Sequence, residues 1–186
     1  MKVLGIDPGS ETTGWAVIEG STRRYQLVNY GALKASPRER FAARLLTISN
    51  GLEDLLQRYA PDVCAIEEAF FAVNVKTALK LGQVRGVALL AAERAGVEIY
   101  EYAPRLVKQT VVGYGAAEKH QVQEMVRVLL KLADGPQPYD ASDALAVAIC
   151  HFHHAGIQAR IRPGAASVKL AALLAAKPRS RRRVRR

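Results

Sequence analysis

The sequence predicts an α/β or α+β domain in which helices cover a mixed β-sheet. Three strand-like segments come first, and helical and strand-like segments then alternate along the rest of the chain. Closely spaced strands favour antiparallel pairing, whereas a strand that follows a helix favours parallel pairing. The 186 residues, 49% of them hydrophobic and 24% charged, are enough for one folded domain and argue against a coiled coil or a wholly disordered chain.

The N-terminal strands are separated by polar turns and are expected at residues 3–6, 13–18 and 25–33. A helix is expected to follow them. Ser36, Pro37 and Glu39 match a capping box with proline in the first helical position. Apolar residues then recur every three or four positions from Phe41 to Tyr59. This periodicity predicts a helix that packs one apolar stripe against the sheet.

Strands and helices are expected to alternate after this helix. The predicted strands cover residues 63–70 and 97–102, and the predicted helices cover residues 74–96, 106–112, 118–132 and 141–154. Gly82 and Gly86 lie four residues apart on one face of a predicted helix. Because glycine has no side chain, we expect another segment to pack close to the helix backbone there.

The chain carries a formal charge of +10 that is concentrated at its C-terminus. Seven of the 27 Lys and Arg residues fall in the last ten positions, which leaves 20 basic against 17 acidic residues elsewhere. We therefore expect a folded domain over residues 1–160 and a basic, disordered tail over residues 161–186. Such a tail favours a polyanionic partner, above all nucleic acid.

The sequence also indicates a compartment. Cys64 and Cys150 lie in apolar stretches, which favours reduced, buried thiols over a disulfide framework. The N-terminal residues lack the pattern of a secretory leader, and no apolar run reaches the length of a membrane span. These features predict a cytoplasmic protein.

Five acidic residues in three segments stand out against their local patterns. Asp7 closes an apolar strand, although turn formation alone also accounts for it. Glu67 and Glu68 point to opposite faces of their strand, so one of them faces a covered side unless the strand lies at an edge. Asp140 and Asp143 lie three residues apart at a predicted helix start, where helix capping alone also places acids.

These carboxylates together form the kind of ligand set that hard divalent cations require. Mg²⁺ and Mn²⁺ prefer oxygen ligands, and two such ions about 4 Å apart can complete their shells with phosphate oxygens. In a basic chain, the set predicts a site that cleaves phosphodiester bonds.

Several longer motifs occur in a consistent order. Gly-Ile-Asp-Pro-Gly-Ser at 5–10 is followed by Thr-Gly-Trp-Ala at 13–16 and Ala-Ile-Glu at 65–67. Next come Lys-Leu-Gly-Gln-Val-Arg-Gly-Val-Ala at 80–88, Val-Lys-Gln-Thr-Val-Val-Gly at 107–113, Ala-Glu-Lys at 117–119 and Asp-Ala-Ser-Asp-Ala-Leu-Ala at 140–146. Over about residues 1–155, the chain resembles the RuvC family of bacterial Holliday junction resolvases. The resemblance implies an RNase H-like α/β fold whose mixed five-stranded sheet has helices on both faces.

The resemblance also implies functional residues. Two Mg²⁺ ions per site, with Mn²⁺ able to replace them, would be held by the catalytic acids Asp7, Glu67, Asp140 and Asp143. The DNA-binding set would be Lys108, Lys119, Phe70, Lys80, Arg85 and Tyr114. Within it, Lys108 and Lys119 are expected beside the scissile phosphate, and Phe70 is expected to stack on an unpaired base at the crossover.

The activity implied by the resemblance is the resolution of four-way DNA junctions in recombination and repair. A homodimer would nick two strands of like polarity symmetrically and leave ligatable 5′-phosphate and 3′-hydroxyl ends. The branch-migration proteins RuvA and RuvB are the implied partners, and the implied location is the cytoplasm at the nucleoid. Glu68 is expected to face away from the phosphate.

Two other functions remain open at this point. One is an RNase H-like nuclease that acts on structured RNA, and the other is a junction-binding protein without catalysis. The turn at residues 5–10 also resembles the phosphate loop of actin-like ATPases, but that class needs a second domain that 186 residues do not supply. A zinc site in the segment 150–154 is disfavoured because no second ligand pair lies at a fitting spacing.

We expect the basic tail to add salt-sensitive affinity for DNA. Deleting residues 177–186 removes seven positive charges, so the plot of log affinity against log salt concentration should become flatter. Titration of labelled DNA at several salt concentrations measures this slope for the full-length and truncated chains. An unchanged slope would contradict a role of the tail in DNA binding.

Overall fold

The computed structural model describes residues 1–21, 24–68 and 74–161, with the side chains of residues 156–161 excluded. Its elements are β1 (Lys2–Asp7), β2 (Thr12–Ser21), β3 (Arg24–Lys34), α1 (Phe41–Tyr59), β4 (Val63–Glu67), α2 (Val75–Arg94), β5 (Glu98–Tyr102), α3 (Pro104–Val112), α4 (Lys119–Leu130) and α5 (Tyr139–Ile161). This order of strands and helices matches the predicted one.

The strands form one five-stranded sheet in the order β3-β2-β1-β4-β5. Strands β1 to β3 pair antiparallel as a meander, and β4 and β5 add in parallel to β1 and β4 respectively. The predicted mixed sheet is therefore confirmed. Since β1 and β4 are parallel neighbours, their carboxyl ends lie at the same edge of the sheet.

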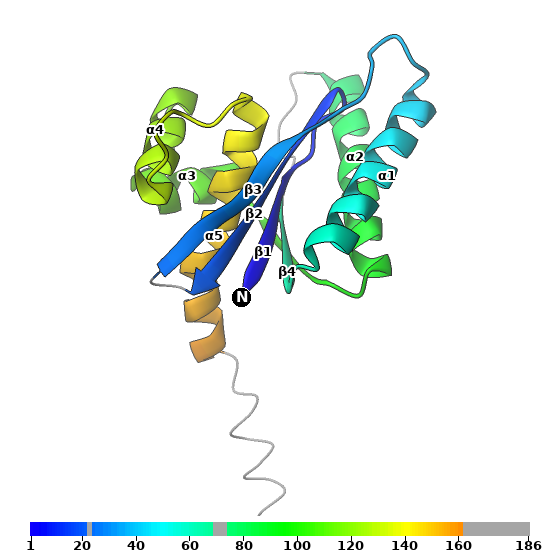
Figure 1. The fold of residues 1–186 in the computed structure, drawn as a ribbon. Coiled ribbons are helices and arrows are strands. Elements are labelled where there is room, and N and C mark those ends of the chain that lie inside the picture. The colour runs from blue at the N-terminus through cyan, green and yellow to red at the C-terminus, as the bar shows by residue number, and fades with distance from the viewer. Residues whose placement is uncertain (22–23, 69–73, 162–186) are drawn as a thin grey trace, which may run out of the picture.

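Helices cover both faces of the sheet (Figure 1). Helices α1 and α2 pack on one face, against Leu4 and Ile6 of β1. Helices α3, α4 and α5 lie on the other face, where Val3 belongs to the core with residues of α5. Successive side chains of β1 thus enter opposite cores, which explains why this strand is almost continuously apolar.

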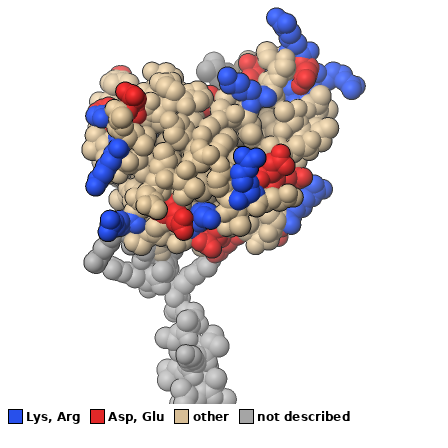
Figure 2. All heavy atoms as spheres, viewed as in Figure 1, with Lys and Arg blue, Asp and Glu red and all other residues tan. Residues whose placement is uncertain are grey.

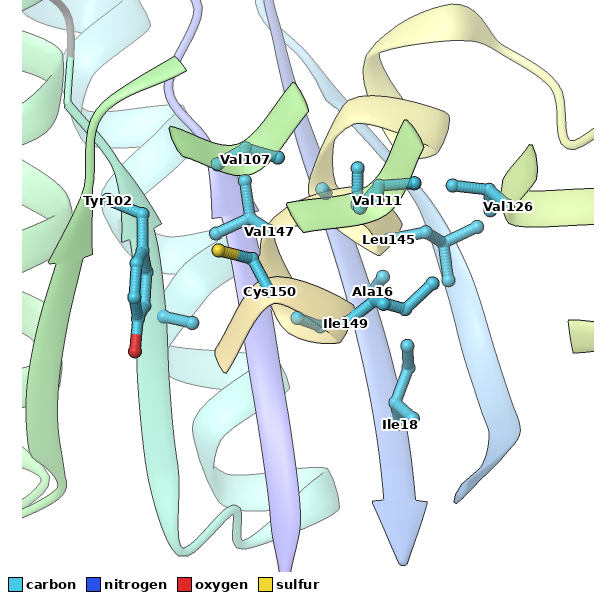
Figure 3. Packing of buried hydrophobic residues seen from close by; sticks show 14 of the residues in the cluster. Ala16, Ile18, Tyr102, Val107, Val111, Val126, Leu145, Val147, Ile149 and Cys150 are labelled. Carbon is cyan, nitrogen blue, oxygen red and sulfur yellow. The ribbon is translucent and has the colours of Figure 1, made fainter. Parts of the chain in front are cut away.

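Helix α5 lies directly on the centre of the sheet (Figure 3). A side chain at Gly5 would overlap the carbonyl oxygen of Ala144, and one at Gly14 would overlap the carbonyl oxygen of Asp140. These two glycines of β1 and β2 therefore permit the close approach of the α5 backbone. The start of α5 is held over the end of the sheet where β1 finishes.

The predicted start of the first helix is wrong. The amide of Arg38 donates to Ser36 Oγ at 3.3 Å, and the amide of Glu39 donates to the Ser36 carbonyl at 3.1 Å. These bonds close a separate turn, so α1 begins only at Phe41 and has no side-chain cap. The structure instead has a capping box at the start of α4, between Glu118 and Gln121.

Other boundaries also differ from the prediction. Strand β4 ends at Glu67, and helix α5 begins earlier and continues further than expected. No segment of the described chain packs closely at Gly82 or Gly86, because a Cβ added at either position meets nothing within 4 Å. The predicted close neighbour of α2 is thus absent from the described residues of this single chain.

The two cysteines lie in the two cores, as expected. Cys64 and Cys150 are both buried and free, and burial raises the pKa of the Cys64 thiol to about 12. Both thiols are therefore packing residues in the reduced form. Among the described helices, none combines the length and the apolar character that a membrane span requires.

Candidate active site

Three elements bring the four predicted acids to one edge of the sheet. Asp7 is the last residue of β1 and Glu67 the last of β4, and the register of these parallel strands aligns Ile6 with Ile66 immediately before them. Asp140 and Asp143 lie in the first turns of α5, which starts over the same edge (Figure 1). The acids thus converge from positions far apart in the sequence.

The alternation of side chains decides which strand acids face the covered side. Val3 and Ala65 belong to the core beneath α5, and Asp7 and Glu67 share their faces of β1 and β4. Glu68 is the first residue after β4. Its backbone amide donates to the Tyr102 carbonyl of β5 at 2.9 Å, which continues the strand pairing past Glu67.

The carboxylates are close enough to share a cation. One oxygen from each of Asp7, Asp140 and Asp143 lies within 4.8 Å of the others, and these side chains are partly buried. Glu67 joins the group through a side-chain hydrogen bond with Asp7. In the described part of the chain, this is the one group of three or more metal-ligating side chains that is compact enough to hold an ion.

The electrostatics of the site reflect an excess of negative charge. Burial and the neighbouring carboxylates raise the pKa of Glu67 to about 9 and that of Asp7 to about 6. Burial also raises the pKa of Asp143, although Lys119 opposes this shift. Carboxylates whose pKa values are raised by burial and by their mutual repulsion are a fitting donor set for a divalent cation, because a bound cation supplies the missing positive charge.

Two of the predicted lysines lie beside the acids. Lys119 Nζ is 2.6 Å from Asp143 Oδ2, and it also lies 5.7 Å from the centre of the Tyr139 ring. Lys108 of α3 lines the same cavity of ≈ 220 Å³ as Glu67, Lys119 and Asp143. The cavity therefore combines carboxylates with cations, which is suited to holding a phosphate next to a metal.

Three other predicted DNA-binding residues, Lys80, Arg85 and Tyr114, do not line this cavity. Lys80 Nζ lies 5.7 Å from the Phe41 ring centre, and Arg85 Nε donates to Glu101 Oε1 at 2.6 Å. The hydroxyl of Tyr114 donates to Gln121 Oε1 at 2.7 Å. Phe70 lies outside the described residues.

Two residues that shape the site were missed by the sequence reasoning. Thr13 is fully buried and donates through Oγ1 to the Gly9 carbonyl at 2.9 Å, so it fixes the turn that follows Asp7. Arg44 is buried on α1 and donates to the Ser10 carbonyl in the same turn. Arg44 lies on the apolar stripe of α1, and a buried guanidinium group needs a hydrogen-bond acceptor, so the sequence held a signal for this contact.

The match to a protein-family model decides which family contains this chain. Residues 3–151 match the model of the crossover junction endodeoxyribonuclease RuvC. The chain belongs to the RuvC family. RuvC of Caldanaerobacter subterraneus subsp. tengcongensis is 49% identical over 88% of this chain and 99% of its own length. RuvC of Chloroflexus aggregans is 53% identical over 83% of this chain and 94% of its own length.

Solved structures agree with this assignment. The structure of Thermus thermophilus RuvC covers 85% of this chain and 97% of its own, with a TM-score of 0.77 and 38% identity. The same protein in complex with a Holliday junction substrate covers 85% of this chain and 96% of its own, with a TM-score of 0.80 and 37% identity. The RNase H-like fold of the RuvC family is therefore confirmed.

In the absence of metal, we expect the stability of the protein to fall as the pH rises. Glu67 binds its proton up to about pH 9 in the folded state but loses it near 4.5 when unfolded, so charging this buried site becomes costly between these values. Glu67→Gln removes this cost and should raise the unfolding midpoint at about pH 8.5 by about 5 °C or more.

Thermal unfolding with a chelator at about pH 5.5 and about pH 8.5 measures this dependence. Glu19→Gln, which alters an exposed glutamate on β2, serves as the control. If Glu67→Gln and Glu19→Gln show the same pH dependence as the wild type, Glu67 does not carry the buried proton.

Proposed function

We propose that this protein is a metal-dependent endonuclease that resolves four-way DNA junctions in recombination and repair. The carboxylate cluster of Asp7, Asp140 and Asp143 is the observation that carries the proposal, because three oxygens within 4.8 Å form a site for a divalent cation in a member of the RuvC family. The relative that was solved with a Holliday junction substrate supports the choice of DNA substrate.

The four acids are the proposed catalytic and metal-binding residues. Asp7, Glu67, Asp140 and Asp143 would hold Mg²⁺, with two ions per site and Mn²⁺ as a substitute. When bound, these ions supply Lewis acidity and lower the pKa of water. Val107 and Ala146 form part of the apolar wall of the cavity beside Glu67 and Asp143.

Lys108 and Lys119 are the proposed phosphate ligands. Both line the cavity beside Glu67 and Asp143, where an ammonium group can contact a phosphate oxygen and stabilise the charge that develops during hydrolysis. The oxygen of water forms the new bond to phosphorus, and the bond to the 3′ oxygen breaks. The leaving oxygen takes a proton, which gives 5′-phosphate and 3′-hydroxyl ends.

Further DNA contacts are proposed outside the cavity. Figure 2 shows basic side chains that project over the connection between β3 and α1, near the sheet edge that carries the acids. Lys80 reaches the Phe41 ring at the start of α1, which places it next to this connection. Phe70, Arg85, Tyr114 and the basic tail at residues 161–186 complete the proposed DNA-binding set.

We also propose that the protein acts as a homodimer. Helix α2 carries an exposed face with Val75 at 74%, Leu79 at 63% and Leu90 at 52% exposure. Gly82 and Gly86 lie on the same helix with open space around them. A second copy of this helix would bury these apolar residues and approach closely at the glycines. Nicking two strands of one junction requires two active sites, which a dimer supplies.

The cellular context follows from the substrate. A four-way junction in DNA is also the substrate of branch migration, so RuvA and RuvB are the proposed partners. The nucleoid in the cytoplasm is the proposed location.

We expect metal-dependent, symmetric nicking of a four-way DNA junction. Incubation of strand-labelled junction with Mg²⁺ or Mn²⁺ should give paired nicks on strands of like polarity, whereas linear duplex stays intact. Asp143→Asn should lower the rate by about 100-fold or more, because it removes a charged ligand of the site. Asp54→Asn, at an exposed aspartate of α1, should cut normally.

Other outcomes of this assay identify different functions. Tight binding without nicks in either metal would indicate a non-catalytic junction-binding protein. Faster cleavage of a structured RNA than of the junction would indicate an RNA nuclease. Cleavage that survives in Asp143→Asn would contradict the proposed site.

We expect Leu79→Arg to convert the dimer into a monomer, because it places a charge in the proposed apolar interface. Val128→Arg is the matched control, since Val128 is 54% exposed on α4, across the sheet from α2. Sedimentation velocity at micromolar concentration distinguishes the two states. A wild type that is monomeric, or a Leu79→Arg variant that remains dimeric, would argue against the α2 interface.

A further inference from the structure

Lys119 forms an ion pair with one of the site carboxylates. Its ammonium nitrogen lies 2.6 Å from Asp143 Oδ2, at the distance of a strong charged hydrogen bond. The Asp143 side chain is 23% exposed and the Lys119 side chain is 53% exposed. The Tyr139 ring lies on the ammonium group at 5.7 Å, which adds a cation–π contact. The lysine is therefore held at the start of α5.

The same carboxylate belongs to the cluster that would hold a cation. An oxygen of Asp143 lies within 4.8 Å of oxygens from Asp7 and Asp140. An ammonium group and a divalent cation that bind one carboxylate repel each other at this separation. Binding of a metal by Asp143 and pairing of Asp143 with Lys119 therefore oppose each other.

We propose that Lys119 is an exchangeable counter-ion that pairs with Asp143 in the metal-free site and moves to a DNA phosphate when metal binds. The inference rests on the proposed function, since it assumes that the carboxylates hold a metal. It adds a coupling between the binding of metal and the binding of DNA phosphate. A phosphate that attracts Lys119 removes the competitor of the metal, and a metal on Asp143 frees Lys119 for the phosphate.

The local structure allows this movement. Lys119 is the first residue of α4, and the capping box of Glu118 and Gln121 fixes the backbone at that point. The lysine stem is more than half exposed, so its ammonium group can swing between two partners without a shift of the helix. The open cavity beside it is also lined by Lys108.

Lys108 provides the comparison that isolates the ion pair. Lys108 lines the same cavity. Its charge also lowers the pKa of Asp143, but less than Lys119 does. Replacement of either lysine removes one positive charge near the site. Only replacement of Lys119 removes an ammonium group that is paired directly with a carboxylate oxygen of Asp143.

The coupling between the two ligands is reciprocal. If DNA raises the affinity for metal by some factor, metal raises the affinity for DNA by the same factor. In the absence of DNA, Lys119 only competes with the metal for Asp143. Loss of Lys119 should therefore tighten metal binding by the DNA-free protein.

The first test measures Mn²⁺ binding by the full-length, DNA-free protein through the electron paramagnetic resonance signal of free Mn²⁺. We expect Lys119→Met to tighten binding by about tenfold, and Lys108→Met to change it by less than about threefold. Lys119→Arg keeps the competing charge and should stay near the wild type.

Each other outcome of this titration counts against a specific claim. Equal tightening in Lys119→Met and Lys108→Met, or no change in either, would overturn the counter-ion role. Absence of Mn²⁺ binding in every variant would overturn both this inference and the proposed function.

The second test observes the ion pair in the wild-type protein. The ammonium nitrogen of Lys119 is followed by nuclear magnetic resonance in protein labelled with ¹⁵N-lysine, and its signal is assigned by its loss in Lys119→Arg. Saturation with Mg²⁺ should shift or broaden this signal because the bond to Asp143 breaks. A signal that persists unchanged while Mg²⁺ is shown to bind would overturn the proposed exchange.

Discussion

Mutual repulsion of carboxylates in a partly buried site governs how this fold is built. Asp7, Glu67, Asp140 and Asp143 converge beside Lys108 and Lys119, so the acids outnumber the lysines that line the site. Burial and like charge together raise the pKa values of both strand acids. Such an arrangement is costly for folding, so it persists only where the scaffold holds it firmly and a cation relieves it in function.

The scaffold meets this requirement through the position of α5. Gly5 and Gly14 leave room for the α5 backbone on the centre of the sheet, and the helix start then lies beside the ends of β1 and β4. The positive end of the helix dipole partly offsets the negative charge of the acids. Lys119 adds a full charge at Asp143, and Thr13 fixes the turn that follows Asp7. Packing, the helix dipole and the ion pair thus all help to hold the carboxylates at this edge of the sheet.

Much of the architecture could be predicted from local patterns, whereas contacts between distant segments could not. Strand and helix order followed from periodicity. Asp7 and Glu67 stood out because they interrupted apolar strands, whereas Asp140 and Asp143 stood out by their spacing at a predicted helix start. The face of Glu67 was undecided until the position of α5 was known. The start of α1 was predicted wrongly because the oxygens of Ser36 bond to a turn before the helix. Arg44 acts across the fold on a turn that local sequence does not connect to it.

Anomalous diffraction from crystals of the protein grown with Mn²⁺ would locate the bound metal directly. We expect an anomalous peak that contacts the carboxylates of Asp7, Asp140 and Asp143, with the ammonium group of Lys119 displaced from Asp143. A peak at another place in the molecule, or no peak at a Mn²⁺ concentration that supports junction cleavage, would contradict the central claim that these acids form the metal site.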